Sequence, residues 1–223
     1  MRFACGLHAH SQDTQVTPVT DISLILFDLN GVLYRYDRDE RIAYLASVTQ
    51  RPPEAVKTAI WGSGFEDSGD AGALDADAYL RGFGVCLGYD LAEDEWVAAQ
   101  RAAVTPIPAT LALAGRVRAE VRCAVLTNNN LLVLRHFQKL YPEVAALVED
   151  RACVSAEFGA RKPDMIVYRS CLIRLGGEPA GTLFVDDSPA NVAGARGAGL
   201  HGHDYVGPDE LAEAFARFGV LQR

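Results

Sequence analysis

The sequence predicts an α/β fold, a doubly wound Rossmann-like parallel sheet whose core carries an inserted α-helical cap. Continuous apolar runs alternate with helical patterns along most of the chain, which is typical of βαβ units. Residues 28–120 separate the first two strong strand signals, far more than one crossover needs, and this interval is mainly helical in pattern. A chain of 223 residues is long enough for one α/β domain with such an insert and too short for two large domains.

The polar residues 1–20 lack the apolar core of a signal peptide, so we expect a flexible leader there. The first strand signal is the apolar run Ile22–Phe27, and Val121–Leu126 and Thr182–Val185 repeat its pattern. Weaker runs occur at Ala152–Val154 and near Leu200. Apolar runs bounded by polar residues are typical of strands buried on both faces of a parallel sheet.

Helical patterns in the core follow the strand signals in alternation. They cover Pro108–Arg118, Leu131–Lys139, Asp164–Leu175 and Pro189–Ala198. The predicted core domain therefore comprises residues 21–36 and 106–223, and Pro106 and Pro108 mark the return of the chain from the cap.

The predicted cap, residues 37–105, contains two pairs of helices. The helices are expected at Arg38–Val48, Pro53–Trp61, Asp75–Leu87 and Ala92–Val104. Between the pairs lies the Gly/Ser/Asp-rich stretch Gly62–Gly72, which we predict to be a loop. Such a loop either reaches the site, with Trp61, Phe65, Glu66 and Asp67 near the substrate, or is a solvated connector.

Composition and charge exclude several classes of function. The net charge of −8 disfavours nucleic acid and anionic membrane as partners, and no apolar run approaches the length of a membrane span. The five cysteines include no Cys-x-x-Cys pair, so we expect reduced thiols in a cytoplasmic protein. The pairs His8/His10 and His201/His203 lack further ligands at metal-binding spacing. We expect a monomer or homodimer.

A carboxylate and a glycine follow the first predicted strand in the segment Phe27–Val32. A carboxylate at the end of a buried strand is costly unless it is paired, hydrogen-bonded or bound to a metal. Asp28 fits a nucleophile that attacks phosphorus and forms an aspartyl-phosphate, or a turn-forming residue. Gly31 would allow a tight turn in which backbone amides face a phosphate.

Two further polar segments follow later strand signals. Thr127 and Asn128 offer a hydroxyl and an amide that can donate to phosphate, or can cap the next helix. Lys162 offers a cation that would neutralise a phosphate and a nucleophile together, or is a surface lysine. Pro163 fits the first turn of the helix that follows.

Asp186 and Asp187 form a pair of adjacent carboxylates after a predicted strand. Their mutual repulsion is relieved by a divalent cation, and hard oxygen ligands suit Mg²⁺. A helix cap would explain one of the two acids and leave the other without a partner.

Together these segments resemble the motifs of the haloacid dehalogenase-like hydrolase superfamily, with a helical cap between the first and second motifs. The resemblance runs from about Asp21 to Phe218. Three segments resemble most closely the branch that contains glucose-1-phosphatase-like enzymes and the N-terminal phosphatase domains of epoxide hydrolases. They are Tyr141-Pro142-Glu143, Arg161-Lys162-Pro163-Asp164 and the run from Asp186 to Asn191.

The resemblance implies a Mg²⁺-dependent phosphatase of small phosphorylated metabolites, including sugar phosphates. It makes Asp28 the nucleophile and a metal ligand. It assigns the phosphate to Thr127, Asn128 and Lys162, and the remaining metal ligands to the backbone carbonyl of Asn30 and to Asp187, with Asp186 binding directly or through water.

Asn30 departs from the family pattern, because most phosphatases of the superfamily have an aspartate two residues after the nucleophile. An amide cannot transfer protons, and loss of general acid–base catalysis costs roughly 10²–10⁴-fold. Three accounts remain: a working phosphatase of the branch that tolerates this loss, a metal-free 2-haloacid dehalogenase, and a catalytically weak phosphate-binding or regulatory protein. The Asp186–Asp187 pair is unexplained by the dehalogenase account.

The dipeptide Asn30-Gly31 is also of the type most prone to deamidation, which would create an acid at position 30. We therefore expect part of the activity of aged preparations to come from deamidated protein. Peptide mass spectrometry alongside activity tests this, since a fully active sample without a mass shift would exclude it.

Overall fold

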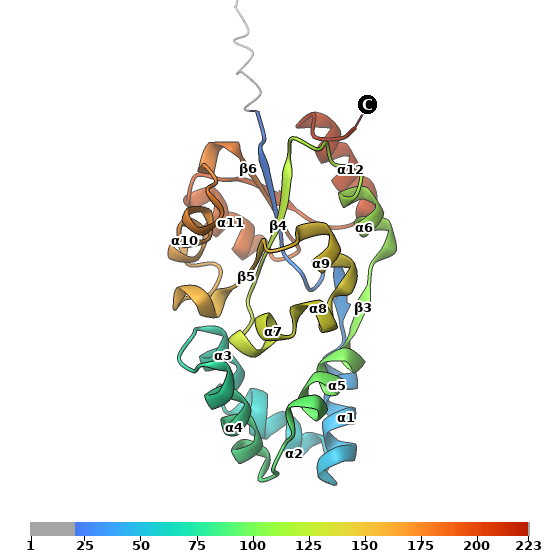
Figure 1. The fold of residues 1–223 in the computed structure, drawn as a ribbon, viewed down its shortest axis with the longest axis vertical. Coiled ribbons are helices and arrows are strands. Elements are labelled where there is room, and N and C mark those ends of the chain that lie inside the picture. Colours follow the sequence, from blue (N-terminus) through green and yellow to red (C-terminus); the bar gives the residue numbers. More distant parts are fainter. Residues whose placement is uncertain (1–20, 223) are drawn as a thin grey trace, which may run out of the picture.

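The computed structural model describes residues 21–222, so the predicted leader, Cys5 and the pair His8/His10 lie outside the described residues. Figure 1 shows two parts along the long axis, with a sheet and its flanking helices at one end and a group of helices at the other. None of the helices in residues 21–222 has both the length and the apolar character needed to cross a membrane.

The core is a parallel sheet of five strands in the order β5-β4-β1-β6-β7. The strands are β1 (Leu24–Phe27), β4 (Arg122–Thr127), β5 (Ala152–Val154), β6 (Thr182–Asp186) and β7 (His201–Asp204). In the central register Phe27 lies opposite Val125 on one side and Val185 on the other. The carboxyl ends of β1, β4 and β6 therefore lie side by side, which confirms the predicted α/β fold.

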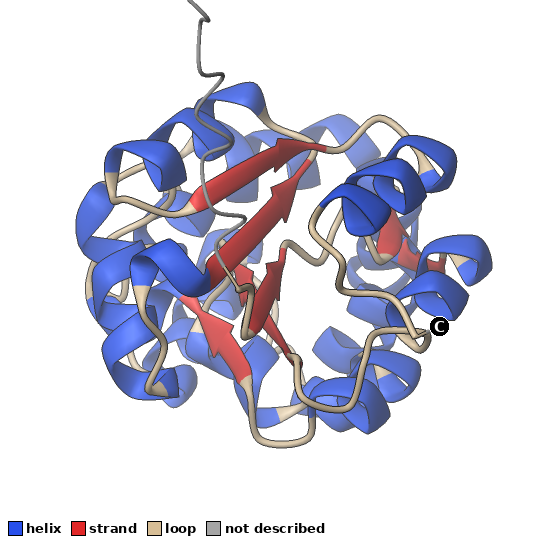
Figure 2. Ribbon diagram, turned by 90° about the horizontal axis from the view of Figure 1, so that it is seen from above, coloured by secondary structure: helices blue, strands red, loops and turns tan. Residues whose placement is uncertain are grey.

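Helices cover both faces of the sheet, as the view from above shows (Figure 2). Alternate residues of β1 serve the two faces, because side chains of a strand alternate in direction. Leu24 and Leu26 pack in the cluster formed with α10 (Met165–Leu175) and α11 (Pro189–Gly197). Ile25 and Phe27 belong to the opposite cluster with α6, α8, α9 and α12. These four helices are α6 (Pro108–Ala114), α8 (Phe137–Leu140), α9 (Pro142–Val148) and α12 (Pro208–Arg217).

The predicted helix Leu131–Lys139 is interrupted at His136, which separates α7 (Leu131–Arg135) from α8. Asn130 begins α7 by accepting hydrogen bonds from the backbone amides of Leu132 and Val133. The first-turn prediction for Pro163 is wrong: α10 starts at Met165, and Asp164 is its N-cap. The Asp164 side chain accepts from the amide of Ile166, and this bond fixes the start of the helix beyond the proline.

The chain passes between core and cap through a two-stranded antiparallel ribbon of β2 (Tyr34–Tyr36) and β3 (Val104–Pro106). The sequence did not predict this ribbon, because three-residue strands carry almost no periodic signal. The cap helices follow the predicted ranges closely. They are α1 (Arg38–Thr49), α2 (Pro53–Lys57) continuing into a π-helical turn (Thr58–Gly62), α4 (Ala76–Leu87) and α5 (Glu93–Ala103).

The predicted loop Gly62–Gly72 is wrong, since Phe65–Asp70 forms the helix α3. Gly64 and Gly72 flank it with φ of +76°, the left-handed conformation that glycine adopts without strain. These glycines are boundary residues of a short helix, and the sequence pattern does not distinguish them from the glycines of a flexible connector.

Ion pairs join cap and core beside α7 and α8. Arg135 Nη2 lies 2.7 Å from Asp77 Oδ1 of α4, and Arg135 Nη1 lies 3.4 Å from Glu93 Oε1 of α5. The imidazole of His136 also contacts Glu93. The cap is therefore bound to the core through α7 as well as through the ribbon.

Candidate active site

The polar segments predicted from the sequence meet at the carboxyl ends of β1, β4 and β6. Asp28 directly follows β1, and its backbone N–H donates to the carbonyl of Val185 at 2.8 Å. Thr127 is the last residue of β4, and Asp186 is the last residue of β6. Ligands of open parallel sheets bind at this edge, where loops from several strands converge.

Lys162 reaches this edge from the loop before α10 and joins the segments electrostatically. Its Nζ lies 2.8 Å from Asp28 Oδ1 and 2.7 Å from Asp186 Oδ2, and it donates to the carbonyl of Leu126 at 3.1 Å. The ammonium is therefore saturated with acceptors and is buried. This placement is incompatible with a surface lysine.

The charges in this group shift one another's pKa. Burial raises the pKa of Asp28 to about 6, the Lys162 ammonium opposes this, and the Asp186 carboxylate adds to it. Burial would lower the pKa of Lys162, but Asp28 and Asp186 outweigh it and hold the pKa above its usual value. Lys162 is thus a permanent cation that shares two carboxylates.

Asp186 and Asp187 have different surroundings although they are adjacent. Asp186 is fully buried, and besides Lys162 it accepts from the backbone amide of Ser188 and from the side-chain amide of Asn191. Asp187 is exposed, and no ion-pair partner for it lies within residues 21–222. Burial, followed by the charge of Asp186, raises the pKa of Asp187.

The three carboxylates of Asp28, Asp186 and Asp187 fit a divalent cation. Each can offer an oxygen such that all three ligand atoms lie within 4.8 Å of one another. Hard oxygen ligands suit Mg²⁺, and one lysine cannot balance three carboxylates. These three carboxylates therefore fit a Mg²⁺ ion, and the expected ligation by the backbone carbonyl of Asn30 stays a prediction.

Glycine is required at position 31, because the segment after β1 closely approaches the segment after β6. The φ of Gly31 is +93°, and a Cβ at this position would overlap the carboxylate of Asp187. The Gly31 amide donates to the carbonyl of Tyr34 at 2.7 Å, which closes a tight turn directly after Asp28. The predicted need for glycine is thus explained both by backbone conformation and by space.

The hydroxyl of Thr127 accepts a hydrogen bond from the side-chain amide of Asn129 at 2.9 Å, so its own proton remains available for a phosphate oxygen. Asn128 is used differently. Its Oδ1 accepts from the backbone N–H of Lys162 at 2.8 Å, and its Nδ2 donates to the backbone carbonyl of Lys162 at 3.0 Å. The Asn128 side chain thus positions the lysine loop, and its role toward phosphate stays a prediction.

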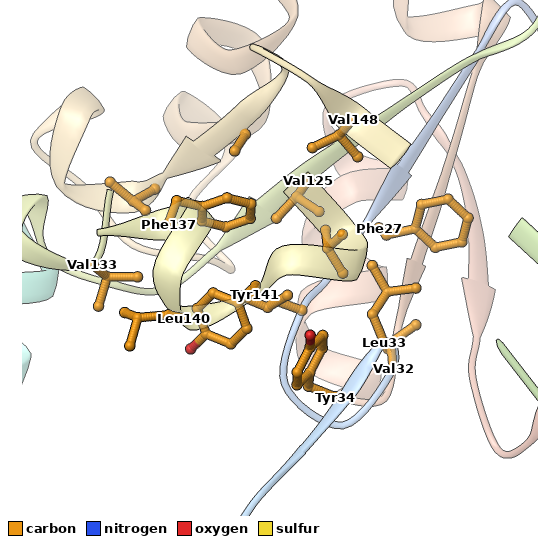
Figure 3. Close-up of a cluster of buried hydrophobic side chains, with 14 of the residues drawn as sticks. Phe27, Val32, Leu33, Tyr34, Val125, Val133, Phe137, Leu140, Tyr141 and Val148 are labelled. Atoms are coloured by element: carbon orange, nitrogen blue, oxygen red, sulfur yellow. The ribbon is translucent and has the colours of Figure 1, made fainter. Parts of the chain in front are cut away.

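Asn30 lies next to the buried hydroxyl of Tyr141. The Oδ1 atom of Asn30 is buried and has no hydrogen-bond partner among residues 21–222. Tyr141 packs edge-on against Tyr34, with ring centroids 5.1 Å apart, and the hydroxyl of Tyr34 donates to Glu143. Figure 3 shows both tyrosines at the margin of the apolar cluster that supports the site.

A cavity of about 210 Å³ lies between the cap and this edge of the core. The core contributes Asn30, Asn128, Asn129, Tyr141 and Arg161, the ribbon contributes Tyr36, and the cap contributes Arg38, Arg41, Trp61, Glu66, Asp67, Asp70 and Gln100. Trp61, Glu66 and Asp67 thus line the cavity, as expected if the predicted loop reached the site, although their segment is helical. Phe65 instead stacks on Tyr79 in the cap core.

Several residues of this region were not found from the sequence. Asp70 and Arg41 enter the cavity from cap helices whose docking no local pattern reveals. Ser155 is buried, donates to the backbone carbonyl of Asp70 at 2.6 Å and accepts from the amide of Asn129 at 3.1 Å. The only sequence signal for Ser155 is its position directly after the weak strand β5. Serine is too common in loops for that signal to be specific.

Comparison with known proteins agrees with this geometry. The family model "haloacid dehalogenase-like hydrolase" matches residues 22–199. Among curated proteins, flavin mononucleotide hydrolase 1 of Arabidopsis thaliana is 33% identical over 89 residues, and the match spans 36% of each protein.

Solved structures share the fold. A predicted haloacid dehalogenase-like hydrolase from Porphyromonas gingivalis superimposes with a TM-score of 0.73 at 22% identity, covering 91% of this chain and 100% of that one. A family enzyme from Bacteroides thetaiotaomicron in complex with magnesium and inorganic phosphate gives 0.67 at 22% identity, covering 82% and 93%. L-2-haloacid dehalogenase from Xanthobacter autotrophicus gives 0.57 at 20% identity, covering 81% and 76%.

The family match covers most of the chain and includes all the residues that meet at the strand ends. With the parallel sheet and the geometry of Asp28, Lys162 and the acid pair, it leads to one conclusion: this chain belongs to the haloacid dehalogenase-like hydrolases.

Proposed function

We propose that this hydrolase is a Mg²⁺-dependent phosphatase of small phosphorylated metabolites that acts through an aspartyl-phosphate on Asp28. The observation that carries the proposal is the buried ammonium of Lys162 between Asp28 and Asp186, next to a third carboxylate on Asp187. This arrangement of fixed cation and oxygen ligands is suited to a dianionic phosphoryl group.

The chemistry follows from what the groups can do. An Asp28 carboxylate oxygen attacks phosphorus, the bond to the leaving-group oxygen breaks, and water later hydrolyses the acyl phosphate. The Thr127 hydroxyl donates to a phosphoryl oxygen, and the nearby Lys162 ammonium offsets the negative charge shared by Asp28 and the phosphoryl group. Mg²⁺, when bound to the acid group, neutralises charge shared by the nucleophile and the phosphoryl group.

Asn30 limits the expected rate of the reaction. Its Oδ1 can accept a hydrogen bond from a water or from a substrate hydroxyl, but it cannot take up the proton. Release of poorly activated leaving groups and hydrolysis of the acyl phosphate should both be slow. We therefore expect good leaving groups to be preferred and the phosphoenzyme to accumulate.

Flavin mononucleotide is a second candidate substrate, favoured by the partial match to the plant flavin mononucleotide hydrolase. Its phosphate is carried on a polyol chain, so the reacting end resembles a sugar phosphate. The three-ring flavin is large compared with the cavity of about 210 Å³, and it would have to remain outside.

The test is a turnover panel of sugar phosphates, flavin mononucleotide, p-nitrophenyl phosphate and 2-haloacids, each with Mg²⁺ and with chelator. We expect phosphate release that requires Mg²⁺ and falls to background in Asp28→Ala. The matched control is Asp94→Ala, which removes an exposed cap carboxylate far from the strand ends.

Two results would contradict the proposal. Halide release that is insensitive to chelator would indicate a dehalogenase. Silence across the panel, with phosphate still bound in calorimetry, would indicate a phosphate-binding protein.

A further inference from the structure

Buried polar atoms without partners concentrate around the cavity between cap and core. Among residues 21–222, the cavity walls contribute Asn30 Oδ1, Arg41 Nε and Nη2, Asp70 Oδ1 and Arg161 Nε to this group. A buried polar atom left unpaired destabilises the fold, and native proteins contain few of them. Their gathering at one cavity indicates a polar ligand that offers both donors and acceptors.

Arg41 is the most constrained of these groups. Its side chain is 3% exposed, its Nη1 lies 2.7 Å from Glu66 Oε1, and its guanidinium lies over the rings of Trp61 and Trp96. The ion pair and the rings hold the guanidinium in one place. Its remaining N–H groups are thus held in place at the cavity wall.

Asp70 is placed in the cavity by close packing of the end of α3 against the core (Figure 1). The Ser155 hydroxyl donates to the backbone carbonyl of Asp70 at 2.6 Å. A Cβ on Gly69 would lie 2.6 Å from the ring of Tyr79, and one on Gly72 would overlap the backbone of Ala156. Glycine at position 72 lets the end of α3 approach the core, and glycine at position 69 lets α3 pack against Tyr79 of the cap, so the two contacts together hold Asp70 at the cap–core boundary.

The other acids on this wall are already paired, and Arg38 lies over the ring of Trp61 without an ion pair among residues 21–222. Arg41 pairs with Glu66, and Arg161 Nη1 lies 2.6 Å from Asp67 Oδ1. Asp70 has neither an ion-pair partner nor a hydrogen bond to its Oδ1 within the described part of the chain. Among the acids that line the cavity, Asp70 alone lacks an ion-pair partner within residues 21–222, so its carboxyl is available to a polar group of the substrate.

We propose that Asp70 is a specificity-determining residue, whose carboxyl, with the fixed N–H groups of Arg41, binds hydroxyl groups on a polyhydroxylated leaving group of the substrate. This inference rests on the proposed phosphatase function and extends it to the residue that selects the leaving group. The cavity of about 210 Å³ is small, which suits a compact leaving group such as a pentitol or hexose better than a multi-ring one.

The protonation state of Asp70 supports this role. Burial raises its pKa to about 8, Glu66 and Asp67 of its own helix add to the rise, and Arg161 and Arg41 oppose it. At neutral pH the carboxyl is therefore mostly protonated. A protonated carboxyl both donates and accepts hydrogen bonds, which matches the hydroxyl group of a polyol.

The experiment compares a polyol phosphate with acetyl phosphate, whose leaving group carries no hydroxyl, in wild type, Asp70→Ala, Asp70→Asn and the control Asp94→Asn. For Asp70→Ala at pH 7 we expect KM for the best hexose or pentitol phosphate to rise about tenfold, with kcat/KM for acetyl phosphate unchanged. Asp70→Asn, which resembles the protonated acid, should restore most of the lost affinity, and Asp94→Asn should behave as wild type.

Equal losses on both phosphates, or an unchanged KM in Asp70→Ala, would overturn the inference. If wild type hydrolyses neither compound, the proposed function fails, and calorimetry with glucose 6-phosphate and inorganic phosphate decides the inference separately. If wild type binds glucose 6-phosphate more tightly than inorganic phosphate and Asp70→Ala abolishes this difference, the inference is supported. Equal binding of the two ligands by wild type refutes the inference.

Discussion

The two residues after the nucleophile have opposite effects on the chemistry. Leu29 and its neighbours form the turn that brings Gly31 against Asp187, so ligand geometry is preserved. Asn30 occupies the position from which a carboxylate would move protons. Under the proposed mechanism, the site is therefore better equipped to form an acyl phosphate than to break it down.

Asn30→Asp should raise the phosphatase rate by roughly 10²–10⁴-fold, because it restores a group that can protonate the leaving oxygen and activate water. The gain should be smallest for acetyl phosphate, whose leaving group needs little protonation. Steady-state kinetics on fresh protein, with Gln138→Glu at an exposed position as an amide-to-acid control, measures it. An unchanged rate on sugar phosphates would show that proton transfer does not limit this enzyme.

Asp70 should make stability depend on pH. Its folded-state pKa of about 8 lies above the ordinary value of 3.8, so between these values the folded chain keeps a proton that the unfolded chain loses. Stability is therefore lost as pH rises from about 4 to 8, and the loss is complete above pH 8. Below pH 4 both states are protonated, and Asp70 contributes nothing.

Asp70→Asn removes this titration, so its advantage over wild type should grow by roughly 10 °C between pH 5 and pH 9, because about three pH units of titration at about 1.4 kcal/mol each convert at about 2–4 °C per kcal/mol. Thermal melts of both proteins at the two pH values measure this change in the Tm difference. Comparing the two pH values cancels any pH-independent effect of the substitution. A difference from wild type that is equal at pH 5 and pH 9 would contradict a raised pKa for Asp70.

Among the elements, α7 and α5 show how the cap is held to the core. Glu93 of α5 accepts from Arg135 and contacts His136, whereas the nearby pair of Asp94 and Lys139 is 3.6 Å apart and largely exposed. Exposed ion pairs contribute about 0–1 kcal/mol and are screened by salt. We expect the Glu93 network to lie at the upper end of that range, because its geometry is better.

A double-mutant cycle with Glu93→Gln and Arg135→Gln should give a coupling energy of about 0.5–1 kcal/mol that shrinks in high salt. The same cycle on Asp94 and Lys139 is the matched control, with coupling near zero. Chemical denaturation at low and high NaCl provides the measurement. Equal coupling energies in both cycles would mean that proximity alone, without good geometry, determines the strength of these ion pairs.

The elements that the sequence predicted well are those with strong periodicity. The parallel strands and most of the long helices were found because a buried strand and an amphipathic helix each repeat a simple pattern. No helix was predicted at α9 or at the ten-residue α12. The ribbon β2/β3 and helix α3 were missed, because both are short and their stability comes from tertiary contacts. Glycines 69 and 72 illustrate the reason: their meaning depends on Tyr79 and Ala156, which lie far away in the sequence.

At the scale of the whole molecule, the sequence predicted one half of the site and not the other. Asp28, Thr127, Lys162 and Asp187 follow strands, and the topology of a parallel sheet brings strand ends together. Arg41 and Asp70 lie on cap helices, and their place in the cavity depends on how the cap docks. The strand-end residues of the proposed chemistry can therefore be predicted from the sequence, while the residues proposed to select a substrate can be found only in the structure.

Ligands that bridge the acid group should stabilise the whole fold, because only the folded chain assembles that site. Mg²⁺ with inorganic phosphate at 100 times the dissociation constant should add about 2.7 kcal/mol to the free energy of unfolding. Asp187→Ala should remove the Mg²⁺-dependent part. Thermal melts with NaCl at matched ionic strength are the control, and an equal shift with NaCl would contradict a specific cation site.

The two-stranded ribbon has a consequence for how such a protein can change. Tyr36 and Val104 pair with one another, so the cap leaves and re-enters the core at adjacent points. An insert whose two ends meet can be exchanged as a cassette without redesigning the framework that receives it. The ribbon therefore marks a natural graft point, at which evolution or an engineer can replace the selecting module and leave the reactive one intact.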